Sequence, residues 1–231
     1  MLLSFFSIFL TYNIVYFKKK GTRVFLEDLN LFIYLIIIVF IFLIFYRFDN
    51  NFSYIFFSIT SSISNIGFSF KEVPLNLIFI FFVLTIIGGS FFSTSSGLRF
   101  IKIYSLVKFS INELLSHSKP NHIFKNKIPF TDSFILMSDI EKYFLSILIF
   151  ILSLFTISFL LTLGGFNFDE SFKIGILTIM NTVNSSMYNL DEFSFSNITN
   201  YSKIILIIFM IIGRVEFITI LILLKKFLLK S

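Results

Sequence analysis

Four long apolar stretches determine what this chain can fold into: 29–46, 73–98, 143–166 and 201–224. About 20 apolar residues in a helix are enough to cross a bilayer. Because 56% of the 231 residues are hydrophobic and 37 are phenylalanine, the chain has more apolar surface than one water-soluble core can bury. The sequence therefore predicts an all-α integral membrane protein.

Three further apolar segments differ from these spans. The run 1–17 ends at three lysines, and we expect a short span that exits into the cytoplasm. The segments 51–70 and 174–190 are shorter and richer in serine, threonine and asparagine. If each of these two enters the membrane and returns on the same side, most lysines and arginines fall inside, as the positive-inside rule requires.

The resulting order of segments is a repeat. The predicted architecture resembles that of potassium channels, with two parallel repeats of span, re-entrant pore loop and span after one partial span. An offset of 120 places Asn65 opposite Ser185, and an offset of 125 places the "IIG" of 86–88 on that of 211–213. The predicted parts are a partial span with a cytoplasmic turn (1–28), a first repeat (29–110), a cytoplasmic linker (111–138) and a second repeat (139–231).

The two polar loops indicate a cation path. Non-helical backbone at membrane depth must be buried in protein or line water, and backbone carbonyls can replace the hydration shell of a monovalent cation. We expect short helices over 53–62 and 172–183, each followed by extended backbone. Gly67 readily takes the positive φ that turns carbonyls toward one axis. The alternative is that Gly67 only lets two helices pack closely.

The second span of each repeat contains one unusual feature. The stretch "IIGGSFFSTSSGL" (86–98) concentrates glycine and serine, which weaken a helix. It predicts a break in the span, beneath the polar loop that we expect to form an ion filter. The alternative is a tight helix crossing. Arg214 and Glu216 lie deep in the last span, where a charge is costly and is by default functional or paired. We expect Arg214 to face the pore axis or the Gly/Ser stretch, or to form an interhelical salt bridge.

Several classes of function are excluded. The chain has no cysteine and two histidines, both in a polar segment, and neither an HExxH nor a GxSxG motif occurs. We therefore expect no enzyme, no cofactor and no nucleic-acid partner. The expected ligand is a monovalent cation, and the expected surroundings are membrane lipid.

The order of these motifs resembles the C-terminal half of the Trk/Ktr family of potassium uptake proteins, the TrkH-like membrane subunits. The stretches that carry the resemblance are "IGGSFFSTSSGLRFIKI", "DESFKIGILTIMNTVNSSMYNL" and "IIGRVEFITILILL". The family pattern GG-x-x-x-S-T-x-x-G is matched by Gly88, Gly89, Ser93, Thr94 and Gly97. The pattern G-R-x-E is matched by Gly213, Arg214 and Glu216.

The resemblance implies four repeats around one pore, a filter that binds potassium through backbone carbonyls, and a gate below it. The third filter would be Ser64, Asn65, Ile66 and Gly67, and the fourth Asn184, Ser185, Ser186 and Met187. The gate would be Gly88, Gly89, Ser90, Ser93, Thr94 and Gly97, with Arg214 as its partner. The resemblance also implies a bacterial inner-membrane location, with the linker and the C-terminus cytoplasmic, and a cytoplasmic nucleotide-binding regulatory subunit.

The chain departs from the family in two ways. It carries two repeats, so a fourfold pore would need a chain with the missing N-terminal repeats or a second copy of this chain. Met187 stands where the family has a glycine, and the offset of 120 also pairs it with Gly67. Two functions follow as alternatives: potassium transport as half of a pore, or a non-conducting or relict membrane protein that keeps the fold as an assembly element.

Overall fold

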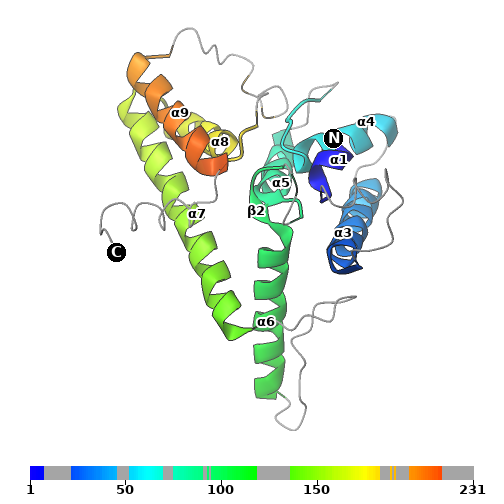
Figure 1. Ribbon diagram of the computed structural model, residues 1–231. Coiled ribbons are helices and arrows are strands. Elements are labelled where there is room, and N and C mark those ends of the chain that lie inside the picture. The colour runs from blue at the N-terminus through cyan, green and yellow to red at the C-terminus, as the bar shows by residue number, and fades with distance from the viewer. Residues whose placement is uncertain are drawn as a thin grey trace.

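The computed structural model describes residues 1–7, 22–45, 52–69, 75–90, 93, 95–118, 136–182, 188, 190 and 198–214. This part of the chain is almost entirely helical (Figure 1). The helices are α1 (Leu2–Phe5), α3 (Thr22–Phe45), α4 (Phe52–Ile63), α5 (Leu75–Ile86), α6 (Phe100–Ser118), α7 (Met137–Leu163), α8 (Phe168–Ile179) and α9 (Asn200–Arg214). The strands are β1 (Ile87–Gly88) and β2 (Leu98–Arg99).

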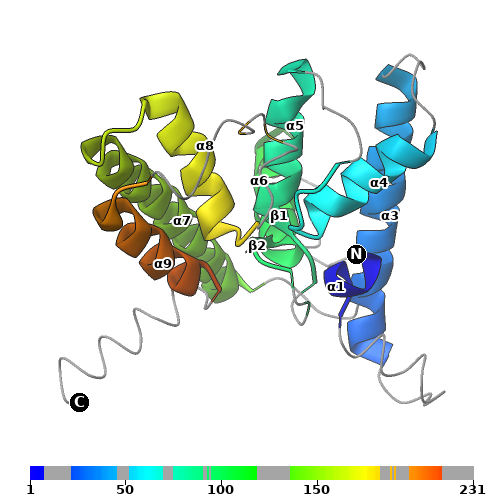
Figure 2. The same ribbon diagram turned by 90° about the horizontal axis from the view of Figure 1, so that it is seen from above.

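The helices form two groups with the same internal order. In Figure 2, α3 and α4 lie on one side with α1 beside them, α7, α8 and α9 lie on the other, and α5 and α6 lie in the middle. In each group a long helix is followed by a 12-residue helix and then by a third helix. One hydrophobic cluster joins the groups, because it includes Ile59 of α4, Leu84 of α5 and Ile157 of α7.

The third helix of the first group is interrupted, as the Gly/Ser stretch predicted. Helix α5 ends at Ile86 and α6 begins at Phe100. A loop lies between them, and the short strands at its two ends, β1 and β2, pair in parallel. Ile87 pairs with Leu98 and Gly88 with Arg99. The alternative of a continuous helix with a tight crossing is therefore wrong. Helix α6 also continues past residue 110, where the sequence placed the start of the linker.

The bounds of the two short helices were predicted with different accuracy. Helix α4 matches the expected 53–62 within one residue at each end, whereas α8 begins and ends four residues before the expected 172–183. The acidic residues Asp169 and Glu170 explain the earlier start. They occupy the first turn of α8, where the helix dipole favours negative charge.

Helix α7 has the length and composition of a membrane span. Of the helices in the described ranges, it is the one that is long and apolar enough by itself to cross a bilayer. Shorter apolar helices cover Asp28–Ile44, Phe52–Ile63 and Leu77–Ile86. Large apolar side chains of α7 are exposed, among them Phe144, Leu152, Phe155 and Phe159. Such a surface is unfavourable in water and requires lipid or another protein to cover it.

Candidate functional site

The predicted third filter begins at the C-terminal end of α4. The backbone N–H groups of Asn65 and Ile66 donate to the carbonyls of Ser62 and Ser61, each at 3.0 Å, and Gly67 N–H also points to Ser61 O, at 3.4 Å. Asn65 (φ 59°) and Gly67 (φ 71°) both have left-handed backbone, a conformation that Asn and Gly tolerate best. The turn therefore directs its N–H groups back to the helix.

The carbonyls of this turn have no protein partner in the described part of the chain. No described residue donates a hydrogen bond to the carbonyl oxygen of Ser64, Asn65, Ile66 or Gly67. The buried amide group of Asn65 also lacks a partner there. Buried polar groups are normally satisfied by protein, water or an ion, so this turn can accept a cation or water from the side that its carbonyls face.

Helix α8 ends in the same turn. Asn181 N–H donates to Thr178 O at 3.1 Å and Thr182 N–H to Leu177 O at 2.9 Å, and Asn181 has a φ of 54°. These bonds repeat those of α4 with an offset of 116, so Asn181 corresponds to Asn65.

The offset of 120 inferred from the sequence is therefore wrong at this turn. With an offset of 116, Gly67 corresponds to Val183 instead of Met187, so the repeat comparison no longer supports a methionine in the glycine position. The predicted fourth filter, Asn184 to Met187, lies outside the described residues. Its place in the filter stays a prediction from the family resemblance.

The Gly/Ser loop, residues 88–97, lies against the N-terminal segment 1–7. Ser90 N–H donates to Phe5 O and Ser95 N–H to Ser4 O, both at 3.1 Å. Gly89 makes this approach possible, because a Cβ at this position would overlap the Phe5 carbonyl. Two backbone hydrogen bonds and one close approach therefore set the distance between the loop and this segment.

Asp28 holds the same segment from the other side. Its carboxylate accepts a hydrogen bond from Ser7 N–H at 2.9 Å and another from Ser7 Oγ at 2.6 Å, and its residue is only 2% exposed. This contact was not predicted, because residues 1–28 were expected to form a partial span and a cytoplasmic turn. The only signal was an acidic residue directly before an apolar run.

Arg99 holds the loop from its C-terminal end. Its Nη1 donates to Ser90 O at 3.0 Å, to Ser93 O at 3.2 Å and to Ser93 Oγ at 3.1 Å. We expected Arg214 to make such contacts. Arg214 is instead exposed, and it forms no hydrogen bond or ion pair with any described residue. Thr94, another predicted gate residue, lies outside the described residues, as does Glu216.

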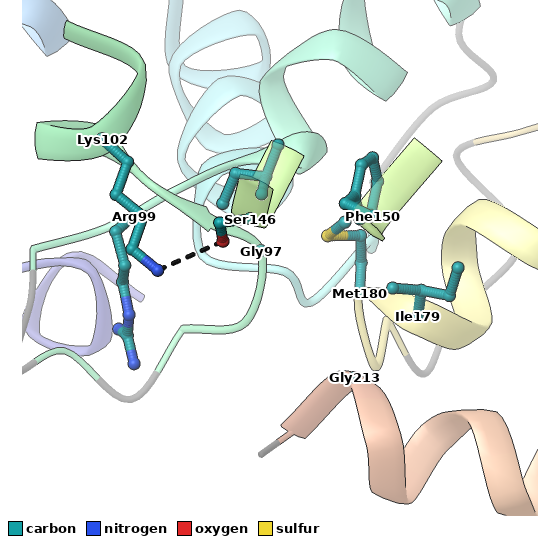
Figure 3. A pocket seen from close by; sticks show the side chains of 9 residues that line it. Gly97, Arg99, Lys102, Ser146, Phe150, Ile179, Met180 and Gly213 are labelled. Carbon is teal, nitrogen blue, oxygen red and sulfur yellow. Dashed lines mark hydrogen bonds between the residues drawn. The ribbon is translucent and has the colours of Figure 1, made fainter. Parts of the chain in front are cut away.

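A small cavity of about 40 Å³ connects the loop with the second repeat. Gly97 and Arg99 line it from the loop, Met180 from the end of α8, and Gly213 from the end of α9 (Figure 3). Arg214 is therefore the next residue in the chain after Gly213, which lines this cavity, although the side chain of Arg214 is exposed.

Lys102 also lines this cavity. It is buried, with 6% of its surface exposed, and its Nζ donates to Ser146 Oγ of α7 at 3.3 Å, as Figure 3 shows. This hydrogen bond is a contact between the two repeats.

Sequence comparison finds a relative that matches this whole chain. The chain is 24% identical over 247 aligned residues to the Trk system potassium uptake protein TrkG of Escherichia coli (strain K12). The chain resembles the Trk potassium uptake proteins. This confirms the resemblance predicted from the motifs, although no family model matches the chain.

The fold resembles that of a Trk protein of known structure. The potassium transporter TrkH from Vibrio parahaemolyticus superposes with a TM-score of 0.69 over 87% of the chain, at 21% identity. The chain covers 49% of TrkG and 42% of the TrkH chain, so it spans about half the length of the Trk proteins that it matches. Both are transport proteins by name, in agreement with the prediction that this chain is no enzyme.

Proposed function

We propose that this chain conducts potassium across a membrane as half of a four-repeat, Trk-type pore. The observation that carries the proposal is the turn shared by the ends of α4 and α8. In each, a short helix ends at an asparagine with left-handed backbone. The C-terminal end of a helix has a partial negative charge, so two such ends favour a cation in front of them.

The filter of this pore consists of backbone carbonyls. In the first repeat these belong to Ser64, Asn65, Ile66 and Gly67, whose oxygens accept no hydrogen bond from the described residues. In the second repeat we assign the filter to Asn184, Ser185, Ser186 and Met187, on the family resemblance. Such oxygens can replace the water around a potassium ion without any charged side chain.

The loop 88–97 acts as the gate of this pore. The interruption between α5 and α6 supports this role, because it places irregular backbone within an apolar segment, which is tolerated only in protein or along water. Arg99 holds the loop in the observed position. Arg214 acts near it, since its neighbour Gly213 lines the same cavity as Gly97.

A complete pore requires two further repeats. Two repeats cannot surround a fourfold filter, so either a chain with the other two repeats or a second copy of this chain completes the ring. The exposed apolar side chains of α7 face lipid or that partner. The assembly lies in a bacterial inner membrane with the linker and C-terminus cytoplasmic, where a nucleotide-binding subunit regulates it.

Growth at low potassium tests this function. A potassium-uptake-deficient bacterium would express the chain alone, or with a chain that carries the first two repeats. We expect growth to be restored in at least one case, and the Gly67→Asp variant to abolish it while remaining in the membrane. Gly165→Asp, at a glycine with open space around it, serves as the matched control. Absence of growth in both cases would favour the alternative, a non-conducting assembly element or relict.

A further inference from the structure

Asp28 is a buried carboxylate that the proposed function does not use. It lies in the N-terminal half of α3, and 2% of its surface is exposed. Both of its oxygens accept from one residue: Oδ1 from Ser7 N–H at 2.9 Å and Oδ2 from Ser7 Oγ at 2.6 Å. Ser7 is itself fully buried. Because a buried carboxylate is costly unless hydrogen bonds compensate it, this contact fixes the end of segment 1–7 on α3.

Segment 1–7 connects this contact to the loop 88–97. The carbonyls of Phe5 and Ser4 accept from the N–H groups of Ser90 and Ser95, both at 3.1 Å. Phe5 is 1% exposed and belongs to the same hydrophobic cluster as Leu31 of α3. The segment therefore lies between α3 and the loop, with hydrogen bonds to each.

Ser90 takes part in two separate contacts that hold the loop. Its N–H donates to Phe5 O of segment 1–7, and its carbonyl accepts from Arg99 Nη1 at 3.0 Å. Its side chain is fully buried, and its Oγ forms no hydrogen bond with a described residue. A loop that leaves this position would have to break both contacts and would expose Ser90.

We propose that Asp28 is a positioning residue for the loop 88–97: through Ser7 it fixes segment 1–7 on α3, and this segment keeps the loop in the observed position. Asp28 acts on the loop only through segment 1–7. Loss of the Asp28–Ser7 contact therefore favours the released loop. The consequence for ion flow rests on the proposed function, because it takes this loop to be the gate.

Labelling of one introduced thiol tests this contact without any ion flux. The chain has no cysteine, so Ser90→Cys provides a single thiol at a buried position. In the purified full chain in detergent, Asp28→Ala should raise the rate at which a maleimide modifies this thiol by about tenfold, the effect of losing a hydrogen bond to a charged group. Ser171→Cys, at a fully buried serine of α8 whose Oγ also has no described partner, is the matched control. Its rate should not change.

A second variant covers the case in which Asp28→Ala does not accumulate. Ser7→Ala removes the bond to Oδ2 and leaves the backbone bond to Oδ1, so it should raise the labelling rate by a smaller factor. In the double variant the two effects should not add, because both changes break the same contact. Rubidium flux through the assembled complex in lipid vesicles should rise in the same order.

Different results would overturn different claims. An unchanged labelling rate of Ser90→Cys in both variants contradicts the positioning role. Equal increases for Ser90→Cys and Ser171→Cys also contradict it, since they show that Asp28 supports the fold as a whole. A selective increase for Ser90→Cys without more flux through a conducting complex contradicts the link to the gate. If the wild-type complex conducts no rubidium, the proposed function fails, while the labelling rates still decide whether Asp28 positions the loop.

Discussion

Replacing Arg99 by glutamine should open the proposed gate. Nη1 of Arg99 donates to the carbonyls of Ser90 and Ser93 at 3.0 and 3.2 Å, and each hydrogen bond from a charged donor contributes about 1.5–3 kcal/mol when buried. Because the side chain is only half-buried, we take about 2 kcal/mol for the whole contact. That energy corresponds to about a thirtyfold change in the equilibrium between held and released loop.

The assay is basal rubidium flux through the assembled complex in lipid vesicles. We expect Arg99→Gln to raise this flux several-fold. Lys142→Gln, which removes an exposed cation paired with Asp139, should leave it unchanged. Arg99→Lys separates the hydrogen bonds from the charge, because lysine keeps the charge but lacks the planar fork. It should give an intermediate flux.

Two results would refute this reasoning. If Arg99→Gln behaves like Lys142→Gln, the contact with the loop does not hold a gate. If Arg99→Lys equals the wild type while Arg99→Gln conducts more, the residue acts by its charge alone and the hydrogen bonds to the loop are irrelevant.

Three further changes have defined outcomes. Gly67→Ala forces a side chain into left-handed backbone at a cost of about 1 kcal/mol and should reduce rubidium uptake at constant protein level. Gly165→Ala imposes a comparable backbone strain (φ 97°) away from the proposed filter and should not reduce uptake. Gly89→Ala should push the segment 1–7 away from the loop, which would be measured as faster proteolysis of that segment. Asp28→Asn weakens the bonds from Ser7 and should lower the midpoint of thermal unfolding in detergent, whereas Glu113→Gln, at an exposed position of α6, should not.

Local sequence properties predicted the architecture well. The break between α5 and α6 follows from the composition of 86–98, since glycine and serine weaken a helix wherever they concentrate. The position of α4 follows from a short apolar segment. Helix α8 was placed four residues too late, because the expected range began at 172 and left out Asp169 and Glu170, which stabilise the first helical turn.

Contacts between distant segments could not be predicted in this way. Arg99 and Arg214 are both arginines near glycines, and only the three-dimensional arrangement determines which one reaches the loop. Asp28 has no sequence feature that pairs it with Ser7. Tyr188 is one of nine tyrosines in a chain rich in aromatic residues, and its hydroxyl bonds to that of Thr85, 103 positions away.

Direct flux measurement tests the central claim that this chain forms half of a potassium pore. The chain would be co-purified with a partner that supplies the other two repeats, or as its own dimer, and reconstituted into vesicles loaded with potassium. A potassium pore formed with this chain should take up radioactive rubidium, be inhibited by external potassium, and lose uptake in Gly67→Asp but not in Gly165→Asp. Vesicles that take up no more rubidium with the wild-type complex than with Gly67→Asp would contradict this role.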